Sequence, residues 1–334
     1  MKAASIEVKR EVLQSAPAAT PILALRHRRA PPAPQASAVS WTRDQLRAGL
    51  DAGQFIPYFQ PKVDLVTDTV HGVEILARWN HPVHGLLQPS CFIDALEYNG
   101  LIDSLTESIV HAALACAHAC SARGCELNFA LNVSPLTLRE PGAAARLIDL
   151  LSDASLAPAR LTIELTETAS SASYPAVLDA LLRARAGGIE VSIDDFGTGH
   201  SSLALLNSMP FTELKIDRAF VCEGVRTDKS QAIAESIVQL ARKLGLRTVA
   251  EGIETGGELA YVRALGCSVG QGYLFARPMD QAGLMDFLGT MHPRRHLHQS
   301  GTGTSRPLLT PPSLVALRSR KAAGVAPVQP RKAR

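Results

Sequence analysis

The sequence is poor in aromatic residues and has no long apolar run. Only 5% of its 334 residues are Phe, Trp or Tyr, although 46% are hydrophobic. No uninterrupted apolar stretch reaches the roughly 18 residues that a membrane-spanning helix needs. The N-terminal region also lacks a convincing secretory signal, because the apolar segment 21–25 is short and runs into three arginines. We therefore expect no transmembrane segment.

Several common catalytic motifs are absent as well. The sequence contains no GxxxxGK phosphate loop, no GxGxxG that opens a helix, and no HExxH zinc motif. Serine and cysteine nucleophiles have no suitable local context. The six cysteines do not follow a CxxC spacing, and nothing about them demands disulfides. This cysteine usage fits a reducing compartment, so we expect a cytoplasmic location.

Charge is distributed unevenly behind a formal net charge of +3. Residues 1–40 carry six basic and two acidic side chains, and residues 293–334 carry nine basic and no acidic ones. The middle segment, 41–292, is acidic, with 19 basic and 29 acidic groups. We predict one folded domain over 41–292, a disordered or partly helical extension over 1–40, and a disordered Pro-rich basic tail over 293–334. The tail lacks interleaved aromatic residues, so we expect no specific nucleic-acid binding.

In the middle segment, short β-branched runs alternate with Ala- and Leu-rich segments of helical period. We predict eight strands, over 55–65, 71–79, 126–133, 161–166, 190–196, 213–217, 247–253 and 268–275. We predict helices over about 41–52, 104–122, 142–152, 174–187, 201–207, 229–244, 256–265 and 280–290. This alternation indicates an α/β fold, a TIM-like (β/α)8 barrel. Too few residues separate the first two strands for a helical crossover, so this pair should be antiparallel.

Oxygen-bearing and charged side chains stand near the C-terminal ends of seven of these strands, where barrel enzymes place their sites. They are Glu74, Asn132, Glu164 with Glu167, Asp194 with Asp195, Lys215 with Asp217, Glu251 with Glu254, and Gln271. Any one of them alone is more often a solvated strand end or a helix cap. As a set, clustered carboxylates repel one another unless cations bind them. Oxygen ligands favour Mg²⁺ or Mn²⁺, with Ca²⁺ as a non-productive occupant. Their number indicates two metal ions, a recurring arrangement in phosphoester hydrolysis.

At these residues the sequence resembles the EAL-domain family, the phosphodiesterases of cyclic di-GMP. The resemblance covers about residues 41–290 and rests on many motifs in order. They are YFQPKV from Tyr58, EILARW from Glu74, NVSP from Asn132, ELTE from Glu164, DDFGTG from Asp194, LKID from Leu214, AEGIE from Ala250 and QGY from Gln271. The resemblance implies a modified TIM-like (β/α)8 barrel with one antiparallel strand.

The resemblance also implies metal ligands and catalytic residues. The first metal would be held by Glu74, Asn132, Glu164 and Asp194, and the second by Asp194, Asp195 and Glu251. The catalytic residues would be Lys215, Glu251, Glu167 and Gln271. Lys215 would contact the attacking water and help to orient or deprotonate it. Glu167 would anchor the loop 197–202, which couples metal binding to dimerisation in this family.

Substrate contacts are implied for a further set of side chains, namely Gln60, Leu76, Arg78, Asp217, Glu254 and Gln271. The implied reaction is metal-dependent hydrolysis of cyclic di-GMP to linear pGpG, which lowers a bacterial second messenger. The alternative is a catalytically weak EAL domain that acts as a cyclic di-GMP sensor or a protein-interaction module. The resemblance further implies a homodimer and leaves room for a regulatory protein partner.

Two positions depart from the family pattern. Ile75 replaces Ala in the naming motif, and His200 replaces the usual Tyr after the Gly of the strand-five loop. The side chain of Ile75 should point away from that of Glu74, because successive residues of a strand face opposite sides. We therefore expect Ile75 to be tolerated. No residue implied as a metal ligand is missing, which favours an active enzyme.

Overall fold

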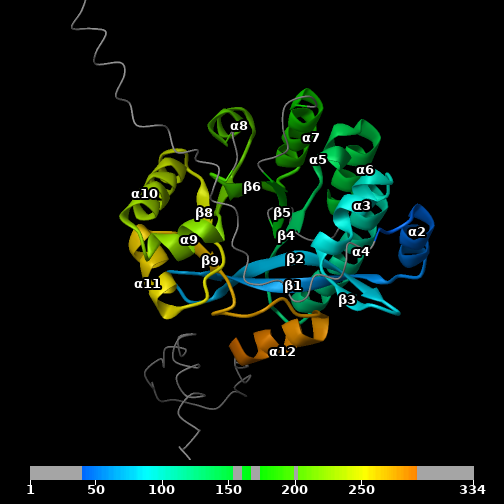
Figure 1. The fold of residues 1–334 in the computed structure, drawn as a ribbon, viewed down its shortest axis with the longest axis horizontal. Coiled ribbons are helices and arrows are strands. Elements are labelled where there is room, and N and C mark those ends of the chain that lie inside the picture. The colour runs from blue at the N-terminus through cyan, green and yellow to red at the C-terminus, as the bar shows by residue number, and fades with distance from the viewer. Residues whose placement is uncertain (1–39, 153–159, 167–173, 199–201, 292–334) are drawn as a thin grey trace, which may run out of the picture. The chain divides into compact units, whose positions relative to one another are not determined.

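The strands of the chain form one sheet that closes into a barrel (Figure 1). The structure, a computed structural model, describes residues 40–152, 160–166, 174–198 and 202–291. Within them the hydrogen-bonded strand order is β1 (Phe55–Asp64), β9 (Val269–Gln271), β8 (Arg247–Ala250), β7 (Glu213–Ile216), β6 (Glu190–Phe196), β5 (Leu161–Thr166), β4 (Asn128–Asn132), β2 (Val70–His81) and β3 (Gly85–Leu87). β1 also pairs with β2, and this pairing closes the barrel.

The first strand of the barrel is the antiparallel one. β1 runs antiparallel to both β2 and β9, whereas the pairs from β2–β4 through β8–β9 are parallel. The short strand β3 is an addition that pairs antiparallel to the end of β2, outside the closed barrel. These pairings confirm the modified (β/α)8 barrel and the antiparallel opening hairpin.

Helices surround the barrel in Figure 1. They are α2 (Arg43–Asp51), α3 (Ile93–Tyr98), α4 (Ile102–Ser121), α5 (Pro135–Arg139), α6 (Pro141–Ser152), α7 (Tyr174–Ala186), α8 (Ser202–Ser208), α9 (Arg218–Gly224), α10 (Asp228–Lys243), α11 (Gly256–Leu265) and α12 (Gln281–Met291). The eight predicted helices are all present within a few residues of their predicted bounds. None of the helices over the described residues is both long enough and apolar enough to cross a membrane.

Sequence periodicity missed three short helices, α3, α5 and α9. Each spans seven residues or fewer, which is too short to show a repeating apolar face. Two of them begin at a side-chain cap directly after a strand. Ser134 accepts a hydrogen bond from the amide of Leu136, and Asp217 accepts one from the amide of Ala219. These capping residues are the sequence feature from which the two helices could have been predicted.

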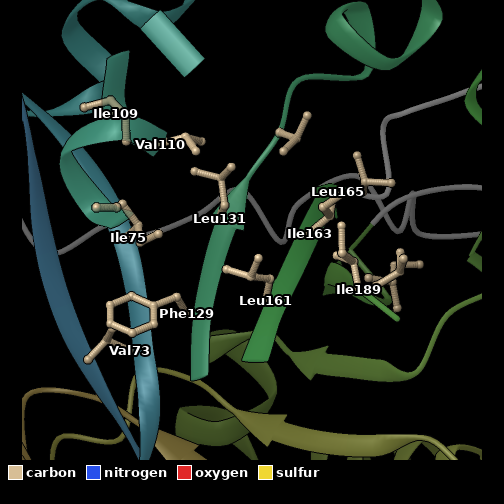
Figure 2. Packing of buried hydrophobic residues seen from close by; sticks show 14 of the residues in the cluster. Val73, Ile75, Ile109, Val110, Phe129, Leu131, Leu161, Ile163, Leu165 and Ile189 are labelled. Atoms are coloured by element: carbon tan, nitrogen blue, oxygen red, sulfur yellow. The ribbon is translucent and has the colours of Figure 1, made fainter. Parts of the chain in front are cut away.

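The outward-facing residues of the strands and the inner faces of the helices form the apolar core. Figure 2 shows Ile75 and Leu131 of neighbouring strands close to Val110 of α4. Ile75 is only 5% exposed and lies in the core cluster. Glu74, its neighbour in the chain, instead bonds to polar groups of the barrel interior. The expectation that these two side chains point in opposite directions is therefore confirmed.

Candidate active site

Lys215 of β7 lies at the centre of a cluster of carboxylates. Its Nζ is 2.8 Å from Glu251, 2.9 Å from Glu164, 3.1 Å from Asp194 and 3.7 Å from Glu74. The lysine is 1% exposed. Glu74, Glu164 and Asp194 come from β2, β5 and β6, and Glu251 directly follows β8. The strands thus bring together side chains that are far apart in the sequence, as the strand-end pattern predicted.

Amide side chains hold Glu74 from two sides. Asn132 Nδ2 donates to Glu74 Oε1 over 2.7 Å, and Gln271 Nε2 donates to Glu74 Oε2. Gln271 Nε2 also lies 3.1 Å from Gln60 Oε1, and Gln60 Nε2 donates to the carbonyl of Ala276. Gln60 and Glu74 are register partners in the β1–β2 hairpin. The hairpin therefore fixes the orientation of a carboxylate that has both oxygens bonded.

The two consecutive aspartates of β6 reach the same site through an unusual backbone. Successive side chains of a regular strand face opposite sides of the sheet. Here the β6–β7 register shifts between Ile193 and Phe196, and Asp195 adopts a positive φ of 53°. Non-glycine residues rarely take this conformation, which is enriched at functional sites. As a result, Asp194, Asp195 and Glu251 offer one oxygen each, with these atoms all within 4.8 Å of one another.

The electrostatics of the cluster show an excess of negative charge. Burial raises the pKa of Glu74 and of Glu251, in each case against the opposing pull of Lys215 and with nearby carboxylates adding to the rise. Burial, Asp194 and Asp217 together raise the pKa of Asp195 to about 7. The two buried ammonium groups at the cluster, those of Lys215 and Lys62, do not neutralise all of its carboxylates. The carboxylates outnumber the buried ammonium groups, and Asp194, Asp195 and Glu251 bring one oxygen each close together. Such hard oxygen donors fit divalent cations such as Mg²⁺ or Mn²⁺.

Lys215 itself is held in the charged form. Burial alone would lower its pKa, but Asp194, Glu164, Glu251 and Glu74 outweigh burial and raise the pKa well above the ordinary value. In this arrangement Lys215 donates hydrogen bonds to the surrounding carboxylates. A lowered lysine pKa would require bound cations beside the ammonium.

The other predicted site residues fall into different settings. The guanidinium of Arg78 lies over the ring of Tyr58, 5.6 Å from its centroid, and donates to the carbonyl of Ala77. Leu76, two residues after Glu74 on β2, is half-buried. Asp217 caps α9 and lies close enough to Asp195 to help raise the pKa of that carboxyl. Glu254 forms an exposed ion pair with Arg218 at 3.0 Å. Glu167 and His200 lie outside the described residues.

Sequence reasoning missed two features near the cluster. Lys62 of β1 is 3% exposed and forms an ion pair with Glu164. The sequence could have indicated this position, because Lys62 stands two residues after Gln60 on the same strand and therefore on the same face. The second feature is a cation–π pair beyond Gln271, in which Arg277 lies 4.2 Å from the ring centroid of Tyr273.

The fold and the cluster define a TIM-like barrel with an acidic site suited to divalent cations at the C-terminal ends of its strands. The chain belongs to the EAL domain family, whose sequence profile matches residues 43–278.

The relatives match this chain over only part of their own length. The cyclic di-GMP phosphodiesterase RocR of Pseudomonas aeruginosa is 39% identical over 239 residues, which is 72% of this chain and 61% of RocR. The cyclic di-GMP phosphodiesterase NbdA of the same organism is 38% identical over 246 residues, 73% of this chain and 31% of NbdA. The chain therefore spans less than two thirds of these proteins.

Solved structures share the fold. A cyclic di-GMP complex of the PaMucR phosphodiesterase matches with a TM-score of 0.68 and 38% identity, covering 72% of this chain and 98% of that one. The EAL enzyme Bd1971, bound to cAMP and cyclic di-GMP, matches with a TM-score of 0.69 and 33% identity, covering 73% and 67%.

Proposed function

We propose that this chain hydrolyses cyclic di-GMP to linear pGpG with the help of two divalent cations, Mg²⁺ or Mn²⁺. The observation that carries the proposal is the convergence of Glu74, Glu164, Asp194 and Glu251 on Lys215 in an EAL barrel. Relatives with about 39% identity are named as phosphodiesterases of this dinucleotide.

The proposal assigns metal ligands to the oxygen-rich cluster. One cation would be held by Glu74, Asn132, Glu164 and Asp194, and the other by Asp194, Asp195 and Glu251. When bound, such cations neutralise phosphate charge and lower the pKa of a bound water. Ca²⁺ would occupy the same oxygens without supporting the reaction.

The remaining roles belong to the chain's own side chains. Lys215, buried at the centre of the carboxylates, would orient the attacking water by a hydrogen bond. Glu251, 2.8 Å from Lys215, would take the proton that the water loses as its oxygen bonds to phosphorus, and the 3′ oxygen released from phosphorus would take a proton from solvent. Gln271 bridges Glu74 and Gln60, so it positions the substrate side of the cluster. Glu167 remains part of the proposal as the anchor of the loop after β6.

Substrate binding is assigned to the rim of the cluster. Arg78, only partly buried, offers a guanidinium to a phosphate of the anionic dinucleotide. Gln60, Leu76 and Gln271 line the same side, and Asp217 and Glu254 lie on segments that follow β7 and β8. Removing the Arg78 guanidinium should raise KM more than it lowers kcat.

A homodimer and a cytoplasmic location complete the proposal. An apolar groove of about 520 Å³ lies between α8 and α10, and Leu203, one of its lining residues, is 67% exposed. Such a patch is typical of a protein interface. All six cysteines are free, which fits a reducing compartment. Sedimentation of the protein and its Leu203→Glu variant tests the dimer, which the new charge should dissociate.

The direct test is hydrolysis of cyclic di-GMP by the purified chain with Mg²⁺ or Mn²⁺, followed as pGpG. Metal-dependent product that EDTA abolishes and Ca²⁺ suppresses is expected. Binding of cyclic di-GMP without product under all metal conditions would instead identify the domain as a sensor. The absence of both binding and product would reject the assignment of substrate.

A further inference from the structure

A second buried lysine, Lys62 of β1, bonds to the carboxylate cluster. Lys62 Nζ contacts Glu164 Oε1, and Lys215 Nζ lies 2.9 Å from Glu164 Oε2. Each oxygen of Glu164 therefore has its own ammonium partner. Glu164 is 1% exposed, so water does not replace either partner readily. Its carboxylate is held in one orientation by two cations from β1 and β7.

Lys62 also connects the cluster to the other end of the barrel. Its Nζ lies 3.5 Å from Glu213, whose second oxygen is 3.2 Å from Arg247. Arg247 in turn bonds both oxygens of Glu190 at 2.8 and 2.9 Å. Glu213, Arg247 and Glu190 are the first residues of β7, β8 and β6. Charges of alternating sign thus run through the barrel from its N-terminal end to Glu164.

An ion pair of this kind is not explained by stability alone. TIM barrels usually fill their interior with branched apolar side chains. A buried pair is often no more stabilising than apolar residues of the same size, because both ions lose their hydration. The pair does favour one direction of the carboxylate, since the ammonium at Oε1 leaves Oε2 turned toward Lys215. That direction matters where geometry must be exact, as at a metal ligand.

We propose that Lys62 is a positioning residue of the metal site, which holds Glu164 by Oε1 so that Oε2 stays directed into the cluster around Lys215. This inference rests on the proposed function, in which Glu164 is a metal ligand. Lys62 touches neither substrate nor the reacting atoms, and it acts only through Glu164.

The test compares two cations that share the partner Glu213, the buried Lys62 and the half-buried Arg247. Lys62→Met removes the bond to Glu164, and Arg247→Met removes a cation that does not contact Glu164. Mn²⁺ affinity is measured by electron paramagnetic resonance of free Mn²⁺, with thermal unfolding recorded alongside. We expect Lys62→Met to weaken Mn²⁺ binding by roughly 10- to 100-fold, as loss of a partner that orients a ligand does. Arg247→Met should stay within about twofold of the unaltered chain, because no ligand loses its partner.

Whether Lys62→Met weakens or strengthens Mn²⁺ binding distinguishes a positioning role of Lys62 from a purely electrostatic one. Removal of a positive charge near a cation site should by itself strengthen Mn²⁺ binding. Weaker binding in Lys62→Met therefore requires the loss of geometry at Glu164. In a Glu164→Gln background, Lys62→Met should add little further loss, because the two residues act as one unit.

Three results would overturn the inference: unchanged or tighter Mn²⁺ binding in Lys62→Met, an equal loss in Arg247→Met, or additive losses in the double variant. An unaltered chain that binds no Mn²⁺ would instead reject the proposed function, and this inference with it. If Lys62→Met does not fold, the pair Lys62→Gln and Arg247→Gln carries the same comparison.

Discussion

The two faces of the barrel strands differ sharply in chemistry. The inner face carries charged and amide side chains such as Glu74, Glu164 and Lys215, which bond to one another across the barrel. The outer face carries apolar side chains such as Ile75 and Ile163, which pack in the layer toward the helices (Figure 2). Residues of the two kinds alternate along the same strands, so a shift of one residue in register would exchange them.

Stability and chemistry are therefore supplied by different side chains of the same strands. Apolar burial between strands and helices stabilises the fold. The inner carboxylates oppose it, because burial raises the pKa of Glu74 and Glu251 and disfavours their charged forms. Substitutions on the inner face should therefore change activity more than stability, and substitutions in the outer layer should do the reverse.

The largest expected effect is the loss of activity in Glu74→Gln. This substitution keeps the shape of the side chain but removes a charged metal ligand, which is worth several kcal/mol in the transition state, or about 1,000-fold in rate. The melting temperature should change little, because the loss of one repelling carboxylate offsets the new amide group that faces Asn132 or Gln271 as a donor. Initial rates of pGpG formation and thermal unfolding measure the two effects.

Glu190→Gln is the matched control for this prediction. It makes the same substitution at the other end of the barrel, where Glu190 pairs with Arg247. The rate of the folded variant should remain within about threefold of the unaltered chain, because no ligand changes. Near-normal turnover by Glu74→Gln, or an equal loss in both variants, would contradict the separation of the two barrel ends.

The second prediction concerns Lys215→Met. We expect kcat to fall by roughly 100-fold or more, with a much smaller change in KM, because a group that orients the reacting water contributes mainly in the transition state. Steady-state kinetics with cyclic di-GMP separate the two constants. Proportional losses in kcat and substrate affinity would show that Lys215 holds the substrate instead.

The outer layer gives the third prediction, through two neighbouring leucines of α7. Leu181 is fully buried in the core, whereas Leu182 is 51% exposed. Leu181→Ala should lower the free energy of unfolding by about 3 kcal/mol, and Leu182→Ala by less than about 0.5 kcal/mol. Urea unfolding measures both. Below its melting temperature, Leu181→Ala should hydrolyse cyclic di-GMP at the normal rate, and a large loss would argue that the layers are coupled.

The alternating pattern of the sequence was sufficient to predict the barrel and most of the cluster. Hydrophobic periodicity located the strands, and the short link between the first two strands predicted their antiparallel pairing. Because parallel strands end on one side of a barrel, residues as distant as Glu74 and Glu251 were expected together, and both contact Lys215. Glu167 was placed by its motif alone and remains a proposal.

Strand ends and single-residue detail were less predictable. The last predicted strand, 268–275, ends at Gln271, where Gly272 comes so close to the backbone of Ile253 that a Cβ would lie 2.1 Å from its carbonyl oxygen. That approach depends on tertiary packing, which no local pattern encodes. The same holds for the positive φ of Asp195, and for Lys62, whose partner Glu164 is 102 residues away.

The smallest expected effect concerns the N-terminal cap of α11, between the apolar layer and the acidic site. Glu258 accepts hydrogen bonds from the amides of Glu254, at 2.7 Å, and Thr255, at 2.9 Å. Burial would raise the pKa of Glu258, but these donors outweigh it and lower the pKa. Its stabilisation is therefore present above the unfolded-state pKa, about 4.3, and is lost as the pH falls through the lower folded-state value.

Glu258→Ala should therefore cost about 1 kcal/mol of unfolding free energy at pH 7, the usual magnitude for a lost helix cap. The difference from the unaltered chain should shrink as the pH falls below about 4, where the unfolded carboxyl is protonated. Urea unfolding between pH 7 and pH 3.5 measures it, and Glu258→Gln, which keeps an acceptor oxygen, should lose less at pH 7. A difference that stays constant with pH would show that packing, and not the charged cap, holds the segment from Glu251 to Glu254 against the barrel. In that case the apolar side chains of the outer face alone would hold this segment in place beside the site.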